Sequence, residues 1–196
     1  MRYSIITPTL VRPTLKRLCD SISAQTAENW EHIVMVDVPL FLSPHPEKEA
    51  ILKSVRHSQR KFFRCGKNHG SFGNQCRWNA FDKASGEYII YLDDDDYLAD
   101  NQVFETLNKV TAMWAIFPIM RCGQRWFCDP PGLMKTGSGM FIYKRETGER
   151  YPNIVGQPGY CADGHLVEAL LKNHPYQALK DERPLMIYEK RGMGKE

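Results

Sequence analysis

The sequence lacks a membrane-length apolar stretch, a large net charge and a close pair of cysteines. Its longest apolar runs fall well short of the ~20 residues that a membrane-spanning helix needs, so any membrane contact is expected to be peripheral. The net charge is only +3, and basic and acidic residues are intermixed. No basic stripe is available for a nucleic-acid backbone, which disfavours nucleic acid as the main partner.

The six cysteines are spread along the chain without a CxxC pair, and no charged and apolar leader precedes the first strand-like segment. Reduced thiols in a cytoplasmic protein are the simplest interpretation. Neither Cys161 with His165 nor Cys122 with Cys128 supplies the four ligands of a zinc site at convincing spacing. The sequence also shows no internal repeat and no GxGxxG fingerprint.

The first half of the chain alternates strand-like and helix-like segments. Residues 3–7, 31–37 and 87–92 are short apolar runs, whereas residues 14–22 and 74–83 show helical spacing or a helical stop signal. This alternation predicts an α/β fold whose parallel strands are joined by right-handed crossovers. With 196 residues, 42% of them hydrophobic, one domain is the default.

The second half is less regular. We expect a helix over residues 103–114, strands over residues 115–120 and 139–143, and a helix over about residues 164–173. Its prolines and aromatic residues suit a substrate-binding lobe of the same domain rather than a separate domain.

Four consecutive aspartates, residues 93–96, follow the strand-like segment 87–92. Adjacent carboxylates repel one another, so the run needs a cation or solvent to offset its charge. Mg²⁺ or Mn²⁺ bound together with substrate phosphates is the usual solution, and a solvated acidic turn is the alternative. Ligands bind at the carboxyl ends of the strands in a parallel sheet, which is where this run lies.

The segment 86–96 resembles the strand and DxD motif of family 2 glycosyltransferases with the GT-A fold. Residues 3–9, 25–37 and 73–79 resemble other nucleotide-site segments of that family, in the family's order. The resemblance covers about the first 100 residues. It implies a single GT-A (Rossmann-like) α/β domain with a mainly parallel central sheet flanked by helices.

Within that domain, residues 1–114 would be the nucleotide-sugar-binding half and residues 115–196 the acceptor-binding half. The resemblance implies that Pro8, Thr9 and Asp37 line the base and ribose pocket. The Asp37 carboxylate would accept a hydrogen bond from uracil N3–H, which favours a UDP-linked donor. Many relatives carry two acids at this place, whereas here the base contact depends on Asp37 alone.

The resemblance implies that Asn74 and Arg77, three residues apart on one helix face, reach the nucleotide or its diphosphate. Asp93 and Asp94 would contact ribose or metal-bound water, and Asp95 would be the direct ligand of Mn²⁺ or Mg²⁺.

Asp163 resembles the base of inverting relatives, although the glutamate that usually precedes it is absent, and a helix N-cap is its alternative role. His165, close by, is a candidate further metal contact.

The expected activity is the metal-dependent transfer of a sugar from a nucleotide-sugar, UDP-linked for preference, to a hydroxyl of a glycan or glycoconjugate acceptor, with inversion. A non-catalytic nucleotide- or sugar-binding module is one alternative. A sugar-phosphate nucleotidyltransferase is another, but the region of Arg12 and Lys16 lacks the glycine-rich loop that such enzymes use. It also stays open whether the chain is one part of a larger multidomain protein.

Overall fold

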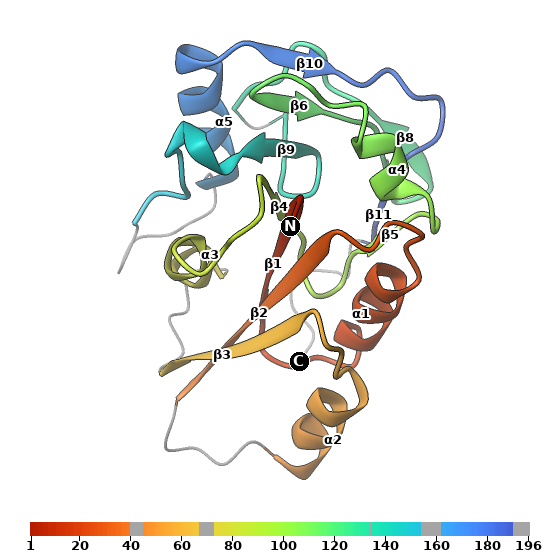
Figure 1. Ribbon diagram of the computed structural model, residues 1–196, viewed down its shortest axis with the longest axis vertical. Helices are drawn as coiled ribbons and strands as arrows, with labels where there is room; N and C mark the ends of the chain where they lie inside the picture. The colour runs from red at the N-terminus through yellow and green to blue at the C-terminus, as the bar shows by residue number, and fades with distance from the viewer. Residues whose placement is uncertain (40–44, 67–72, 134, 154–161, 190–196) are drawn as a thin grey trace.

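Two β-sheets, one of seven strands and one of four, form the framework of the protein (Figure 1). The structure, a computed structural model, describes residues 1–39, 45–66, 73–133, 135–153 and 162–189. Among these residues, no helix has the length and apolar character needed to cross a membrane.

The larger sheet has the strand order β10-β6-β9-β4-β1-β2-β3 and is mainly parallel, as predicted. Of its seven strands, β9 alone runs against the others, because it pairs antiparallel with both β4 and β6. The strands are β1 (Tyr3–Thr9), β2 (Trp30–Pro39), β3 (Arg60–Gly66), β4 (Tyr88–Tyr91), β6 (Trp114–Ile116), β9 (Phe141–Lys144) and β10 (Tyr176–Ala178).

Helices cover both faces of this sheet (Figure 1). The side chain of Ile5 packs with those of α1 and α4, whereas its neighbour Ile6 packs with those of α3 and α5. This period-2 alternation places apolar side chains on both faces of the strands, which is typical of a buried parallel sheet. The helices are α1 (Leu15–Ser23), α2 (Pro46–Ser54), α3 (Asn74–Phe81), α4 (Val103–Leu107), α5 (Ala162–Asn173) and the 3₁₀ turn η1 (Arg145–Thr147).

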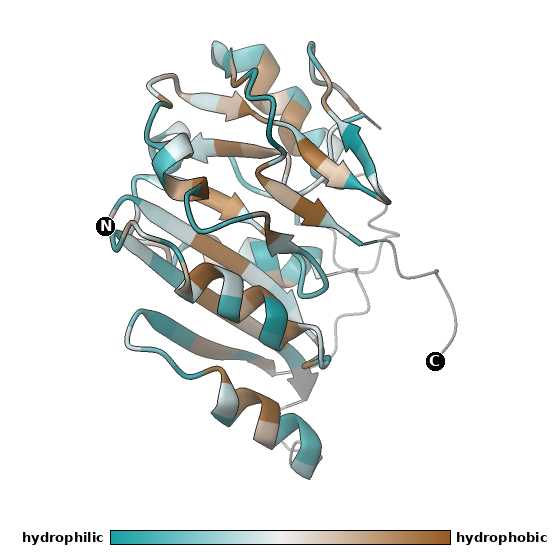
Figure 2. Ribbon diagram, turned by 90° about the vertical axis from the view of Figure 1, so that its right-hand side faces the viewer, coloured by the Kyte–Doolittle hydropathy of each residue, from teal (hydrophilic) through white to brown (hydrophobic). Residues whose placement is uncertain are grey.

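Hydropathy follows the layers (Figure 2). The strands of the sheet are hydrophobic along much of their length, and the helices carry hydrophobic residues interrupted by hydrophilic ones. In β2, Ile33 and Met35 belong to the core on the α3 side, whereas Val34 and Val36 contact the core formed with α1. The sheet is therefore held between two apolar layers.

The smaller sheet has the order β5-β11-β7-β8 and lies next to the aspartate run. Its strands are β5 (Tyr97–Leu98), β7 (Ile119–Arg121), β8 (Gln124–Trp126) and β11 (Met186–Tyr188). Because β5 begins directly after Asp96, pairing of β5 with β11 ties the end of the aspartate run to the C-terminal part of the chain.

Several element boundaries differ from the prediction, and three of the differences have a clear physical cause. The first strand was expected to end before Pro8, but β1 continues through Pro8 to Thr9. The backbone of Ile6 faces β4, since its carbonyl accepts from Leu92 N, and Pro8 faces the same side two residues later. The register between β1 and β4 stops at Ile6, so the absent N–H of Pro8 forfeits no ladder hydrogen bond.

The helix expected over residues 103–114 ends at Leu107. The Arg2 guanidinium donates to the carbonyls of Asn108 and Val110, and the Tyr88 hydroxyl also donates to Val110. These contacts take up carbonyl groups that a longer helix would use internally.

The strand expected over residues 115–120 is divided at Pro118 into β6 and β7, which belong to different sheets. Proline interrupts a ladder because it has no N–H to donate.

Candidate active site

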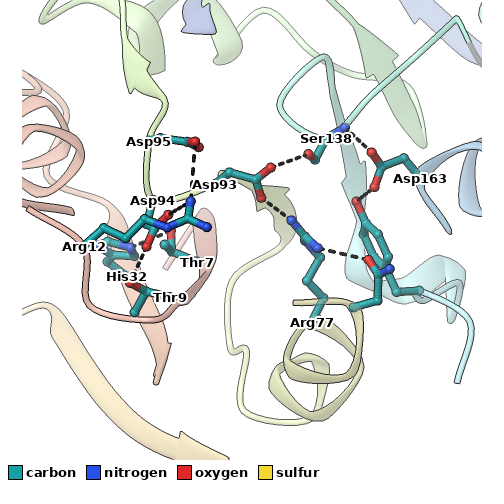
Figure 3. A network of polar contacts seen from close by, with 12 residues as sticks. Thr7, Thr9, Arg12, His32, Arg77, Asp93, Asp94, Asp95, Ser138 and Asp163 are labelled. Carbon is teal, nitrogen blue, oxygen red and sulfur yellow. Dashed lines mark hydrogen bonds and ion pairs between the residues drawn. The ribbon is translucent and has the colours of Figure 1, made fainter. Parts of the chain in front are cut away.

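The carboxyl ends of β1 and β4 meet at the aspartate run. Asp94 is buried and accepts a 2.5 Å hydrogen bond from the Thr9 hydroxyl, which in turn accepts from the backbone N–H of Val11. Arg12 lies 3.3 Å from a carboxylate oxygen of Asp94 and 3.5 Å from one of Asp95. Burial raises the pKa of Asp94 to about 6, although Thr9 and Arg12 oppose the shift. The run is therefore anchored to the first strand and the loop after it (Figure 3).

Asp93, Asp95 and Asp96 each offer a carboxylate oxygen, and these oxygens lie within 4.8 Å of one another. Asp96 is only 1% exposed, and neither of its carboxylate oxygens has a hydrogen-bond partner among the described residues. Burial and the charges of Asp93 and Asp95 raise the pKa of Asp96 well above its ordinary value. A buried carboxylate without a partner is costly unless a cation binds it, and oxygen ligands suit Mg²⁺ or Mn²⁺. These three residues therefore fit a divalent cation.

Helix α3 brings Arg77 to the same place. Its guanidinium forms an ion pair with Asp93 and donates to the side-chain oxygen of Asn74 at 3.0 Å. Arg77 is buried, which alone would lower its pKa, but Asp93 and other nearby groups raise it above the ordinary value.

Helix α3 can approach the first strand closely because Gly73 precedes it. Gly73 has a φ of 76°, and a Cβ atom there would lie 2.6 Å from the ring of Pro8. Both Pro8 and Arg77 are thus held by the entry into this helix.

Asp163 lies in the first turn of α5, and its two carboxylate oxygens are held separately. One accepts from the hydroxyl of Tyr151 at 2.5 Å, and the other accepts from the backbone N–H of Ser138 at 3.0 Å. Tyr151 is fully buried, and burial together with Asp163 raises its pKa well above the ordinary value, so it remains a hydrogen-bond donor.

Asp163, Ser138, Asp93 and Arg77 are joined in a chain of contacts across the site (Figure 3), and Tyr151 closes this chain into a ring of five residues. The Ser138 hydroxyl lies 3.4 Å from a carboxylate oxygen of Asp93, and Asp93 pairs with Arg77. The Arg77 guanidinium carbon is 5.1 Å from the centre of the Tyr151 ring, and the Tyr151 hydroxyl donates to Asp163. The ring joins the carboxyl end of β4, α3, the segment before β9, and α5.

Asp93 and Asp163 both line a cavity of about 230 Å³. Its wall also includes Arg121 and Lys135, which are exposed, and Tyr188. The guanidinium carbon of Arg121 lies 5.3 Å from the ring centre of Trp126 and 5.5 Å from that of Tyr188. The cavity therefore has two carboxylates and two cations on its wall.

Asp37 lies in β2 with a different set of neighbours. A carboxylate oxygen of Asp37 and the sulfur atoms of Cys65 and Cys76 all lie within 4.8 Å of one another. The hydrogen bond with Cys65 and burial raise the pKa of the Cys76 thiol, and Asp37 also hydrogen-bonds it. Both thiols are free in this structure.

Most predicted site residues converge at the carboxyl edge of the sheet. Thr9 contacts Asp94, Arg77 contacts both Asn74 and Asp93, and Asp163 shares a cavity with Asp93. Their functional roles stay predictions.

His165 is placed differently. Its side chain is 58% exposed on α5 and lies 3.5 Å from Glu168, and it belongs to neither group of potential metal ligands among the described residues. A metal role for His165 stays a prediction that this arrangement does not support. Cys161, considered above with His165, lies outside the described residues.

Asp96, Ser138 and Tyr151 were not identified as site residues from the sequence. Asp96 stood in the aspartate run, but spacing alone does not tell which of the four carboxylates points inward. Ser138 lies in a segment rich in small residues, which was a usable signal. No sequence pattern singled out Tyr151.

A family model described as "Glycosyl transferase family 2" matches residues 4–163. Comparison with curated protein sequences gave no match.

Similar folds occur in solved structures. One is S. aureus TarS 1-349 in complex with UDP-GlcNAc, with a TM-score of 0.77 and 17% identity over 99% of this chain and 60% of that chain. Another is the mannosyltransferase PcManGT from Pyrobaculum calidifontis in complex with GDP-Man and Mn²⁺, with a TM-score of 0.68 and 14% identity over 97% of this chain and 58% of that chain. The chain thus spans about 60% of the length of these structures.

Proposed function

This chain belongs to glycosyl transferase family 2, and we propose that it transfers a sugar from a nucleotide-sugar to a hydroxyl group of a glycan or glycoconjugate acceptor, with inversion at the anomeric carbon. The observation that carries this proposal is the ring from Asp93 through Ser138 to Asp163 (Figure 3). It puts a carboxylate from the aspartate run and a carboxylate from α5 on the wall of one cavity. Transfer requires groups on both sides of the reacting sugar.

The nucleotide binds along the carboxyl ends of β1 and β2 in this proposal. Pro8 and Thr9 border the ribose, and Asp37, buried in β2, accepts the N3–H of uracil. UDP is therefore the favoured nucleotide. The complexes of similar structures include both UDP-GlcNAc and GDP-Man, so the donor preference rests on Asp37 rather than on those likenesses.

Arg77 and Asn74 orient the diphosphate side of the donor. Arg77 is buried, its charged form is favoured by Asp93, and Asn74 fixes one end of its guanidinium. A guanidinium held in this way has a fixed orientation, as recognition of phosphate oxygens requires.

Asp93, Asp95 and Asp96 are the residues that would hold Mn²⁺ or Mg²⁺, with Asp95 as the ligand that the family resemblance also implies. Held there, such a cation would supply positive charge to offset that of the departing nucleoside diphosphate. The support from this chain is the buried carboxylate of Asp96, which has no hydrogen-bond partner among the described residues.

Asp163 accepts the proton of the acceptor hydroxyl. Tyr151 and Ser138 each bind one of its oxygens, which fixes the direction of the carboxylate, and Asp163 remains partly exposed at the cavity. The acceptor is expected to enter from the side formed by residues 115–196, where Arg121 and Tyr188 line the cavity.

Calorimetry of UDP, GDP and CDP binding with Mn²⁺ present tests the donor. UDP should bind most tightly, and tighter binding of GDP or CDP would contradict the role of Asp37.

Hydrolysis of UDP-sugars by the purified protein separates an enzyme from a binding module. We expect slow hydrolysis that Asp95→Ala abolishes and that Asp82→Asn, an exposed aspartate paired with Arg150, leaves intact. Retention of anomeric configuration in the transfer product would exclude the assignment of Asp163 as base.

A further inference from the structure

Asp37, Cys65 and Cys76 form a second group of potential metal ligands, made of different residues from the aspartate run. They come from three elements: Asp37 from β2, Cys65 from β3 and Cys76 from the first turn of α3. β2 and β3 pair directly, and α3 packs on this side of the sheet, where Cys76 is part of the core and Cys65 packs against it. The fold itself therefore brings the three side chains together.

The spacing of these atoms suits a tetrahedral ion. With metal–sulfur bonds of about 2.3 Å and metal–oxygen bonds of about 2.0–2.2 Å, ligand atoms around Zn²⁺ lie roughly 3.5–3.8 Å apart. The three atoms lie within 4.8 Å of one another in the metal-free chain, so an inward movement of about 1 Å or less brings them to those distances. Small rotations of the side chains are sufficient.

The chemistry of the group differs from that of the aspartate run. Two sulfur ligands select a thiophilic ion such as Zn²⁺, whereas three carboxylates select Mg²⁺ or Mn²⁺. Cys76 is fully buried, but Cys65 is half-buried, which leaves a route by which an ion can enter and a side on which a fourth ligand, such as water, can bind.

We propose that Asp37, Cys65 and Cys76 form a binding site for a thiophilic divalent cation of the Zn²⁺ class, with three protein ligands and one open position. Binding forms two metal–sulfur bonds and one metal–oxygen bond, and each of the two thiols releases its proton to solvent. No oxidant or reductant takes part.

An ion at this site would also affect the nucleotide, a consequence that rests on the proposed function. The Asp37 carboxylate cannot at once coordinate the ion and serve freely as the acceptor for the uracil base. Zn²⁺ would therefore weaken UDP binding at this end of the pocket, whereas Mn²⁺ would act at the aspartate run.

The test is a titration of the whole chain with Cd²⁺, a thiophilic probe, in the presence of a thiol-free reductant. We expect thiolate-to-Cd²⁺ charge-transfer absorption that saturates at one ion per chain. Cys65→Ser and Cys76→Ser should each weaken binding by more than the roughly 10–100-fold that is typical of losing an outer-sphere partner. Cys122→Ser, which removes an exposed thiol, is the matched control and should leave the absorption unchanged.

Circular dichroism establishes that each variant is folded, and the half-buried position of Cys65 makes Cys65→Ser the safer of the two. Absence of the absorption in the unaltered chain would overturn the proposal, as would its persistence in folded Cys65→Ser.

Calorimetry of UDP with and without Zn²⁺ separates this proposal from the proposed function. Charge transfer in a chain that binds none of UDP, GDP and CDP removes the function and leaves the metal site. UDP binding without charge transfer removes the metal site and leaves the function.

Discussion

The hydroxyl of Tyr151 donates a 2.5 Å hydrogen bond to one carboxylate oxygen of Asp163. The tyrosine is fully buried and packs edge-on against Tyr91, with ring centres 4.6 Å apart, so its hydroxyl has little freedom to move. The direction of the Asp163 carboxylate is thus fixed by a side chain that belongs to the core.

Replacement of Asp163 by asparagine should lower kcat for sugar transfer by roughly 100-fold to 10,000-fold, because the acceptor hydroxyl loses the group that takes its proton. Asn keeps the size; its amide oxygen can accept from the Ser138 N–H, and its NH2 group can donate to the hydroxyl oxygen of Tyr151, so the fold and UDP binding should be preserved. Steady-state kinetics and calorimetry measure the two effects. Transfer at the normal rate by this variant would exclude Asp163 as the base.

Tyr151→Phe should lower kcat by about 10-fold and leave KM for the donor nearly unchanged, because loss of one hydrogen bond of about 1 kcal/mol loosens Asp163 without removing a donor contact. Tyr176→Phe is the matched control, since it removes an exposed tyrosine–aspartate hydrogen bond of 2.8 Å to Asp129. Equal decreases of kcat in Tyr151→Phe and Tyr176→Phe would show that the effect of Tyr151 is not exerted through Asp163.

Asp96→Asn should stabilise the metal-free protein near pH 7.5 and remove most of the stabilisation that Mn²⁺ provides. The pKa of Asp96 is raised well above 3.8, so its contribution to stability is full below that value and is lost as pH rises through the raised pKa. Asparagine does not ionise and so avoids this loss. We therefore expect the free energy of unfolding of the metal-free protein to rise by about 1–3 kcal/mol.

Thermal unfolding across pH, with and without Mn²⁺, measures both effects of Asp96→Asn. Asp82→Asn, at an exposed position, should change neither the stability near pH 7.5 nor the stabilisation by Mn²⁺. If Mn²⁺ raised the melting temperature of Asp96→Asn as much as that of the unaltered chain, Asp96 would have no part in metal binding.

Glu31→Gln should destabilise the protein at neutral pH by about 2 kcal/mol, because the buried carboxylate accepts hydrogen bonds from Ser4 and Ser85 and lies 3.0 Å from the ammonium of Lys61. Burial alone would raise the pKa of Glu31, but these contacts lower it from 4.5 to about 2.

The stability that Glu31 contributes is therefore present above pH 4.5 and is lost as pH falls toward 2. Urea unfolding at several pH values between 2 and 7 gives the free energy of unfolding at each pH. This free energy should change less with pH in Glu31→Gln than in the unaltered chain. Glu28→Gln, at an exposed position, should show the same pH dependence of the free energy of unfolding as the unaltered chain.

The sequence predicted those parts of the site that follow from local patterns. Apolar runs that end shortly before Thr9, at Asp37 and before the aspartates identify strand ends, and parallel pairing then brings those ends to one edge. The helical spacing of Asn74 and Arg77 likewise placed both on one face of a helix, and in the structure Arg77 donates to the side-chain oxygen of Asn74. In each case, neighbours in sequence determine the geometry.

The remaining parts depend on contacts between distant segments. Tyr151 packs against Tyr91 and from there donates to Asp163, and no local pattern carries that information. The four aspartates look alike in sequence, yet Asp94 faces Thr9 while Asp96 is buried without a hydrogen-bond partner in the part of the chain that the structure describes, because the turn and its packing direct each side chain differently. Burial of this kind is a property of the folded chain.

Strand β11 is synthesised after the strands with which it pairs, so the smaller sheet cannot be completed early. Met186 pairs with Leu98 beyond the aspartates and with Ile119 beside the cavity, and its side chain occupies the space next to Gly139. A ribosome supplies these partners long before Met186, so the nascent chain can form β1 to β4 while the second sheet still lacks its central strand. The side of the cavity formed by β7 and β11 is therefore completed only after residue 186 has been synthesised.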